Sequence, residues 1–152
     1  IGKDTVVYPF VVIEKNVKVG KRCSIGPFCR LRPGTVIGDD VEIGNFVEIV
    51  RSKIKSKSKA KHLTYLGDCV VGREANIGCG TITANFDGKK KNRTTIGDKA
   101  HIGSGTIFVA PVKVGKGAVT GAGSVILRNK NVPAKAVAVG VPARILNKRE
   151  KR

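Results

Sequence analysis

Residues 25–49 read IGPFCRLRPGTVIGDDVEIGNFVEI and place an aliphatic residue at every sixth position. The same step extends back to the first residue and gives nine aliphatic anchors in a row: Ile1, Val7, Ile13, Val19, Ile25, Leu31, Ile37, Ile43 and Ile49. A period of six fits neither the 3.6-residue turn of an α-helix nor the seven-residue repeat of a coiled coil. The sequence therefore predicts a repeat architecture built from hexapeptides.

A second track of small or β-branched residues runs two positions before the anchors. Its members are Thr5, Val11, Val17, Cys23, Cys29, Thr35, Val41 and Val47. Glycine often follows an anchor, as at Gly20, Gly26 and Gly38, and tolerates the backbone that a sharp corner demands. We interpret each hexapeptide as one short strand and one corner, so that three of them close a triangular coil of about 18 residues. Stacked coils would then pair as parallel strands ~4.8 Å apart, and the fold class is all-β.

The six-residue pattern breaks twice along the chain. It stops after Ile49, resumes at Val71, stops again after Thr83 and continues from Ile96 to Ile126. We expect the polar, basic segments at about 50–64 and 84–93 to leave the coil and form a binding face, as insertions in repeat proteins often do. The chain then divides into a β-helix domain, 1–140, and a basic C-terminal tail, 141–152.

The net charge of +18, from 29 basic and 11 acidic residues, predicts attraction to anions. Nucleic acid, phosphorylated metabolites, CoA and an acidic membrane face all fit this charge, and so does a solvated surface that keeps the protein soluble. No apolar run approaches the ~18 residues that span a bilayer. The four cysteines lack metal-type spacing and are interpreted as reduced thiols, and no signal-peptide pattern is present. We therefore expect a cytoplasmic protein, and a domain cut from a longer chain is one interpretation of its start at Ile1.

Two histidines are candidates for proton transfer. His62 lies in KHLTYLGD, residues 61–68, beside Tyr65, and an unperturbed pKa near 6.5 suits a general base. An ordinary loop residue is the alternative. His101 directly precedes the anchor Ile102, so we expect a surface or inter-coil role for it. Two histidines do not make a three-His zinc site, and we predict no metal site.

Three longer strings carry a family resemblance: KHLTYLGD (61–68), ANIGCGTITANFDGKKKNRTTIGD (75–98) and IGSGTIFVAPVKVGKGA (102–118). Together with residues 25–49, they resemble the acetyltransferase domain of the bifunctional N-acetylglucosamine-1-phosphate uridyltransferase/glucosamine-1-phosphate acetyltransferase. The similarity covers about residues 1–128. It implies a left-handed parallel β-helix, although parallel crossovers are right-handed in about 98% of cases. It also implies a homotrimer with sites between subunits.

The resemblance implies acetyl transfer from acetyl-CoA to the amine of glucosamine-1-phosphate or a close relative, in nucleotide-sugar and cell-envelope precursor synthesis. His62 would be the general base and Glu48 would orient its imidazole. The amine would attack the thioester directly, with positioning and backbone N–H groups at the oxyanion as the main contributions. The implied substrate-binding residues are Arg32, Tyr65 and Lys91 for the sugar phosphate and Asn76 and Asn85 for the sugar. The implied acetyl-CoA contacts are Cys79, Ser104 and Ala122, with Arg144 as a candidate for the CoA phosphates.

Three departures from the family pattern bear on the acceptor. Val50 stands where the family has a phosphate-binding lysine, with Arg51 beside it; Phe86 lacks the hydroxyl of the family's NYDG; and the chain ends in AVGVPARI, residues 138–145. A hexapeptide acyltransferase with a different amine or hydroxyl acceptor is therefore the first alternative.

A non-catalytic basic β-helix that serves as a scaffold is the second alternative. Aromatic stacking platforms are lacking, so nucleic acid is not the expected partner. No glycine-rich nucleotide-binding loop occurs, so we predict no uridylyl transfer from this chain.

Overall fold

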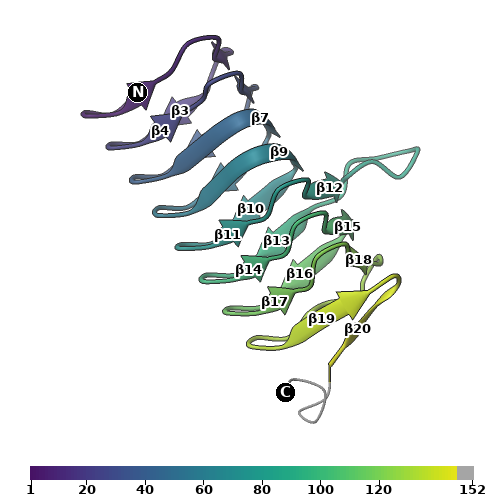
Figure 1. Ribbon diagram of the computed structural model, residues 1–152. Coiled ribbons are helices and arrows are strands. Elements are labelled where there is room, and N and C mark those ends of the chain that lie inside the picture. The colour runs from purple at the N-terminus through teal and green to yellow at the C-terminus, as the bar shows by residue number, and fades with distance from the viewer. Residues whose placement is uncertain (147–152) are drawn as a thin grey trace.

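The computed structural model describes residues 1–146 as a three-sided column of stacked coils (Figure 1). Every regular element in this range is a β-strand, and the chain makes about seven turns around the column. Consecutive coils pair in parallel along the whole column, and the one antiparallel pair of named strands in this range joins the last two strands. The parallel β-helix predicted from the six-residue repeat is confirmed.

The coils form three faces. The first face contains β1 (Val6–Val7), β4 (Ser24–Ile25), the first halves of β7 (Glu42–Val50) and β9 (Lys59–Gly67), β11 (Asn76–Ile77), β14 (His101–Ile102), β17 (Val119–Thr120) and β19 (Val137–Gly140). The second face contains β2 (Val12–Ile13), β5 (Arg30–Leu31), the second halves of β7 and β9, β12 (Ile82–Ala84), β15 (Ile107–Val109) and β18 (Val125–Ile126). The third face contains β3 (Lys18–Val19), β6 (Val36–Ile37), β8 (Lys53–Ile54), β10 (Cys69–Val71), β13 (Thr94–Ile96) and β16 (Val112–Val114).

The faces meet at two corners that matter for function. We call the bend between the first and second faces the first corner. There, β7 and β9 run around the bend without a break and pair along their whole length. We call the bend between the second and third faces the second corner.

Coil length varies along the column. Arg22 and Asp40, whose side chains bind each other on neighbouring coils, are 18 residues apart, as three hexapeptides require. The step between Asn45 and His62 is 17 residues. The step between Arg73 and Asp98 is 25 residues, because the longest coil carries an insertion at the second corner. The 17-residue coils are one residue shorter at the same corner. All of these differences in coil length therefore lie at the second corner.

The expected first excursion, 50–64, is wrong. These residues form a regular part of the column that includes β8 and the start of β9. Ile54 is 1% exposed and Ala60 is fully buried, so both point into the core. Basic residues are frequent here because they alternate with buried residues on a strand, not because the segment leaves the fold.

Two steps of five residues, in place of six, between buried positions explain this error. Ile54 follows the anchor Ile49 by five residues, and Val71 follows Leu66 by five. A strict count of six therefore lands on Lys55, which is exposed, and the pattern looks broken. The column tolerates the loss because the missing residue lies in a corner and not in a strand.

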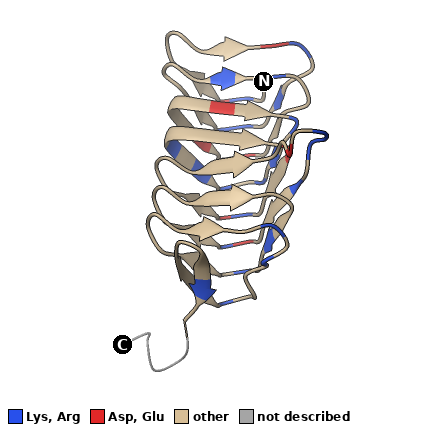
Figure 2. Ribbon diagram, turned by 90° about the vertical axis from the view of Figure 1, so that its right-hand side faces the viewer, with Lys and Arg blue, Asp and Glu red and all other residues tan. Residues whose placement is uncertain are grey.

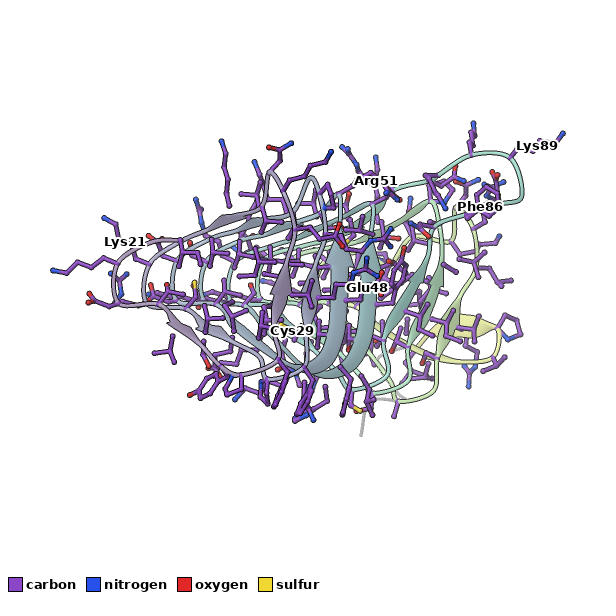
Figure 3. All side chains as sticks on the ribbon, turned by 90° about the horizontal axis from the view of Figure 1, so that it is seen from above. Lys21, Cys29, Glu48, Arg51, Phe86 and Lys89 are labelled. Carbon is purple, nitrogen blue, oxygen red and sulfur yellow. The ribbon has the colours of Figure 1, made fainter. Side chains whose placement is uncertain are left out.

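The second excursion is confirmed. Residues 85–93 connect β12 to β13 and stand out from the column as a loop (Figures 1 and 3). We call them the insertion loop. It leaves the column at the second corner.

The interior of the column is aliphatic and finely layered. The anchors from Ile25 to Ile49 are all at most 2% exposed, and each buried Ile or Leu contributes roughly 1.5–3 kcal/mol. The second track is also buried from Cys23 onward. Its hydroxyl groups satisfy backbone groups, since Thr81, Thr106 and Ser124 each donate to a glycine carbonyl three residues earlier at 2.7 Å. Cys23, Cys29, Cys69 and Cys79 are free, and burial raises the pKa of Cys69 to about 12.

The two ends of the column differ. At the N-terminal end, Ile1 is 72% exposed and Val7 is 40% exposed, because no coil covers them. At the C-terminal end, β20 (Ala143–Ile145) turns back and pairs antiparallel with β19, so residues 141–146 of the expected tail pack on the last coil. The basic residues Lys148, Arg149, Lys151 and Arg152 lie outside the described part of the chain. Within residues 1–146, no helix is long and apolar enough to cross a lipid bilayer.

Candidate active site

Five residues at the first corner form a line along the column. Asn45 and His62 are directly in register on β7 and β9. The pairing of β9, β11, β14 and β17 places Cys79, Ser104 and Ala122 at the equivalent positions of the coils that follow. Backbone hydrogen bonds of 2.7 Å link these coils, from Gly105 to the Cys79 carbonyl and from Gly123 to the Ser104 carbonyl. We call this line the corner column. It brings together His62 and the three residues expected to contact acetyl-CoA.

The residue that directly follows each corner-column position is of a different type on the two sides of His62. Above His62, this position is held by Phe10, Phe28 and Phe46, which are exposed and stacked with ring centroids 4.9 and 5.7 Å apart. The expectation from the sequence that aromatic stacking surfaces are lacking is therefore wrong. Leu63 follows on the same coil as His62. Below it the position is glycine, at Gly80, Gly105 and Gly123, each with a positive φ between 70° and 74°. We call these glycines the glycine trough.

The trough is an open surface. A Cβ atom placed on Gly123 would meet nothing within 4 Å, and one on Gly105 would touch only the Gly123 backbone at 3.6 Å. Bulky residues therefore end, and open space begins, at the level of His62. A long thin ligand can lie along the column here.

His62 is exposed at the edge of a groove of about 280 Å³ that Tyr8, Pro27, Glu42 and Asn45 also line. Its Nδ1 lies 3.1 Å from Asn45 Oδ1. In the tautomer in which Nδ1–H donates to that amide oxygen, Nε2 carries the free lone pair and can accept a proton. Sequence reasoning missed Asn45, although its spacing from His62 is that of one shortened coil.

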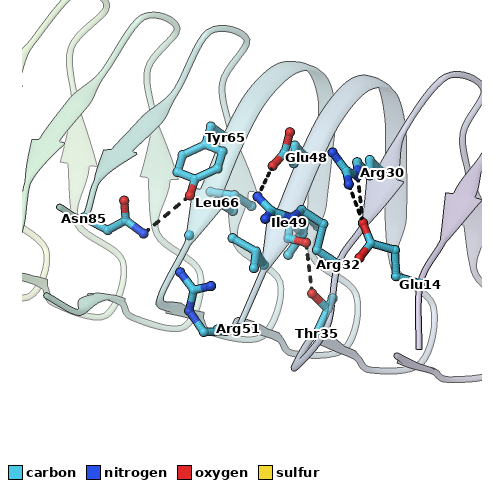
Figure 4. A network of polar contacts seen from close by, with 12 residues as sticks. Glu14, Arg30, Arg32, Thr35, Glu48, Ile49, Arg51, Tyr65, Leu66 and Asn85 are labelled. Carbon is cyan, nitrogen blue, oxygen red and sulfur yellow. Dashed lines mark hydrogen bonds and ion pairs between the residues drawn. The ribbon is translucent and has the colours of Figure 1, made fainter. Parts of the chain in front are cut away.

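Glu48 does not contact His62. Its carboxylate accepts a hydrogen bond from Arg32 Nη1 at 2.7 Å (Figure 4). Glu48 pairs with Tyr65 on the second face. Tyr65 follows His62 by three residues, and β9 bends between His62 and Tyr65 at Leu63, whose φ is 45°. The corner thus separates the two side chains, and Asn45 rather than Glu48 holds the imidazole in this structure.

The Arg32–Glu48 pair belongs to a polar surface on the second face (Figure 4). The Glu48 hydrogen bond raises the pKa of Arg32, so the guanidinium stays charged. Arg32 Nε is buried and has no hydrogen-bond partner among the described residues. An unpaired buried donor is costly, so a group that accepts a hydrogen bond there gains affinity. Tyr65 lies on the neighbouring strand, in register with Glu48.

A second cluster adjoins this surface at the second corner. Arg51 binds Asp68 through two hydrogen bonds of 2.7 and 2.8 Å, and Asn85 donates to Asp68 at 2.5 Å and to the Tyr65 hydroxyl at 3.5 Å. The Arg51 guanidinium, followed by the Asn85 amide, lowers the pKa of Asp68. Arg51 is therefore already paired, and Val50 beside it is only 2% exposed.

Lys91 and Asn76 occupy two different sides of the column. Lys91 lies on the insertion loop, with its Nζ 4.3 Å from the centre of the Phe86 ring. Its charge makes a small contribution to lowering the pKa of Asp68, after those of Arg51 and Asn85. Asn76 lies on the first face, between Lys59 and His101 in register. The insertion loop thus carries both Asn85 and Lys91, whereas Asn76 lies apart from them on the first face.

Arg144 lies at the lower end of the corner column. It is on β20, opposite Val139, and β19 continues the first face beyond β17. Within residues 1–146, no group of three or more His, Cys, Asp or Glu side chains could hold a metal ion. Lysines and arginines are spread over the outside of the coils and the insertion loop (Figure 2).

Comparison with known proteins agrees with the resemblance seen in the sequence. Residues 13–138 match the protein family described as the GMPPB C-terminal domain. The bifunctional protein GlmU of Pseudothermotoga lettingae is 61% identical over 106 residues, which are 70% of this chain and 23% of that protein. The GlmU protein of Thermotoga maritima is 42% identical over 173 aligned residues, 92% of this chain and 38% of that protein. The chain thus spans well under half the length of these relatives.

A solved structure has the same fold. AntD, an N-acyltransferase from Bacillus cereus, was crystallised as its S84A mutant with dTDP-4-amino-4,6-dideoxyglucose and coenzyme A. It superimposes with a TM-score of 0.71 at 22% identity, over 91% of this chain and 83% of that chain. The likeness shows that the two proteins share the parallel β-helix fold.

Proposed function

The chain belongs to the GMPPB C-terminal domain family and is 61% identical to a GlmU protein over 70% of its length, and we propose on this basis that it is a CoA-dependent N-acetyltransferase. The acceptor is the amine of glucosamine-1-phosphate or a close amino-sugar phosphate, and acetyl-CoA is the co-substrate. The reaction belongs to the synthesis of nucleotide-sugar and cell-envelope precursors. Both substrates are intracellular metabolites, so we place the activity in the cytoplasm.

The observation that carries this proposal is the corner column. His62 stands at the head of the glycine trough, and Cys79, Ser104 and Ala122 line the path below it. We propose that the pantetheine arm of acetyl-CoA lies along this trough with its thioester near His62. Arg144, at the lower end, is then suited to the CoA phosphates.

The chemistry needs one base and one oriented thioester. His62 Nε2 takes a proton from the acceptor amine while the nitrogen attacks the thioester carbonyl carbon. The C–S bond then breaks, and the proton goes to the departing CoA sulfur. No covalent acyl-enzyme forms. Asn45 keeps Nδ1 as the donor and Nε2 as the base, which is a positioning role.

The acceptor phosphate fits the polar surface on the second face. Arg32 offers a buried Nε–H that has no partner among the described residues, and Glu48 holds the guanidinium through Nη1. Tyr65 and Asn85 are joined by a hydrogen bond beside it, and Lys91 adds a positive charge. Asn76 lies on the face that carries the trough and would contact the sugar near the thioester.

We propose that the working enzyme is a homotrimer. A single chain offers a groove open to solvent at His62 and an exposed aromatic ridge of Phe10, Phe28 and Phe46. A neighbouring copy would cover the ridge and supply the opposite wall of the trough. Light scattering should then give three times the 16.1 kDa chain mass.

A second acceptor class is favoured by one observation. Val50 is buried and Arg51 is held by Asp68, so neither position offers a free cation for a phosphate. An amino-sugar acceptor without a phosphate would not depend on that cation. Profiling of amino-sugar acceptors at equal acetyl-CoA concentration separates the two classes.

The test is release of free thiol from acetyl-CoA in the presence of glucosamine-1-phosphate. His62→Ala should lower kcat by roughly 10²–10⁴-fold, the usual contribution of a general base. Arg22→Ala is the control and should keep activity, because Arg22 pairs with Asp40 on a different corner from His62. Absence of thiol release with every amino sugar would refute the proposal, and so would full activity of His62→Ala.

A further inference from the structure

The insertion loop is tied to the column from two directions. Towards the N-terminal coils, Asn85 at its base binds Asp68, which also holds Arg51. Towards the C-terminal coils, Asp87 binds Arg128, which lies 41 residues further along the chain. The upper tie belongs to the polar surface on the second face. The Asp87–Arg128 contact is not part of that surface and takes no direct part in the proposed reaction.

Arg128 bridges two coils to reach the loop. It follows β18, whose strand lies two coils below β12 in the order β12, β15, β18. Its Nε donates to the carbonyl of Ala110 on the intervening coil at 3.2 Å, and its Nη2 donates to Asp87 Oδ2 at 2.8 Å. The guanidinium thus makes two hydrogen bonds at the second corner, one to the intervening coil and one to the insertion loop.

Asp87 organises the loop from inside. Its Oδ1 accepts hydrogen bonds from the backbone N–H groups of Lys89 and Lys90 at 3.0 and 2.8 Å. Its Oδ2 accepts one from the Asn92 amide at 2.9 Å in addition to Arg128. One carboxylate therefore closes the tip of the loop and fastens it to the column. These donors, with the Lys90 N–H foremost, lower the pKa of Asp87.

The loop is a small hairpin whose two sides meet above Asp87. Phe86 and Lys91 form an antiparallel bridge, and Asn92 N–H donates to the Asn85 carbonyl at 2.6 Å. Lys91 is therefore carried on a frame whose orientation depends on Asp87. Figure 3 shows Phe86 near the base of this frame and Lys89 at its tip, clear of the column. An exposed loop in such a position needs a tie to hold a fixed orientation.

We propose that the Asp87–Arg128 pair is a clamp that orients the insertion loop and thereby positions Asn85 and Lys91 for the acceptor. This inference rests on the proposed function for its effect on catalysis, but the clamp itself does not. Arg128 and Asp87 are positioning residues, and neither touches the reacting atoms.

The first test measures the loop without using activity. Hydrogen exchange of a peptide that covers residues 85–93 is compared between wild type and Arg128→Ala. Loss of a partly exposed ion pair should speed exchange by roughly three- to fivefold in this peptide. The matched control is Arg22→Ala, which removes a similar exposed pair with Asp40 at 2.7 Å on another corner. It should leave exchange of residues 85–93 unchanged.

The second test uses steady-state kinetics. In Arg128→Ala the KM for the acceptor should rise by about threefold or more, because a smaller fraction of the molecules has the loop in place. The KM for acetyl-CoA and the kcat at saturating acceptor should stay within about twofold. Arg128→Lys should be intermediate, since an ammonium can reach Asp87 or the Ala110 carbonyl but cannot fork between both.

Two outcomes overturn the clamp. One is unchanged exchange in residues 85–93 of Arg128→Ala, and the other is an equal increase throughout the chain, which would indicate general destabilisation. Faster loop exchange with an unchanged acceptor KM overturns the role in acceptor binding. A wild-type protein inactive towards every amino sugar would refute the proposed function, while the exchange comparison would still decide whether the clamp exists.

Discussion

Replacement of Ile54 by alanine tests whether five residues, and not six, separate the buried Ile49 from the next buried anchor across the second corner. Ile54 is 1% exposed on β8, between β6 and β10 on the third face. The change removes three buried carbon atoms, at ~0.8 kcal/mol each for transfer alone. The closely stacked coils cannot collapse into the space, so a cavity cost adds to this. We expect a loss of about 3–4 kcal/mol in the free energy of unfolding.

Lys55→Ala is the matched control. An unbroken six-residue count would put residue 55 in the core, whereas the structure leaves Lys55 exposed. We expect its replacement to change the free energy of unfolding by less than about 0.5 kcal/mol. The two neighbouring positions thus distinguish a five-residue step from a six-residue step.

Thermal unfolding followed by circular dichroism measures both variants at one protein concentration, because assembly would make the midpoint depend on concentration. The Ile54→Ala midpoint should fall by roughly 10 °C, and the Lys55→Ala midpoint by about 1 °C at most. A large loss for Lys55→Ala together with a small one for Ile54→Ala would refute the five-residue step and the register derived from it.

Two further predictions concern the trough and the second corner. Gly123→Asn should raise the KM for acetyl-CoA by about tenfold or more, because asparagine tolerates the positive φ but fills open space in the trough. Gly117→Asn, at φ 63° on another corner, should leave this KM unchanged. The same KM for acetyl-CoA in both variants would contradict binding along the trough. Asp68 has a lowered pKa because of Arg51 and Asn85, so its stabilising contribution is complete above its ordinary pKa and is lost as the pH falls through the lower folded value. The stability deficit of Asp68→Asn should therefore be constant near neutral pH and shrink in strong acid, and a deficit that grows on acidification would count against the pairing.

The periodic part of the fold could be predicted because its cause is local. A strand position that faces the interior every six residues is usually aliphatic, and the anchors from Ile25 to Ile49 show this directly in the sequence. The insertion loop was also visible, since residues 84–93 are polar where an anchor is due. The five-residue steps from Ile49 to Ile54 and from Leu66 to Val71 were not visible in the sequence. Each coil is one residue shorter near Val50 or Gly67, and this shifts the six-residue count without any other change in the pattern.

The site was predicted unevenly for a different reason. His62 and the residues of the corner column could be located through the family resemblance, which preserves spacing along the chain. Contacts between coils depend on register, and the step from Asn45 to His62 falls one short of three full hexapeptides. Asn45 was therefore missed as the partner of His62, and Glu48 was assigned to it although the bend at Leu63 keeps them apart. The Asp87–Arg128 contact spans 41 residues and an insertion, so no fixed spacing indicates it.

A crystal structure with acetyl-CoA and an amino-sugar phosphate tests the central claim most directly. We predict that the pantetheine arm lies along Gly80, Gly105 and Gly123, and that the acceptor nitrogen lies within hydrogen-bond reach of His62 Nε2 and ~3–3.5 Å from the thioester carbon. Coenzyme A bound on the third face, or a thioester at the opposite end of the column from His62, would contradict it.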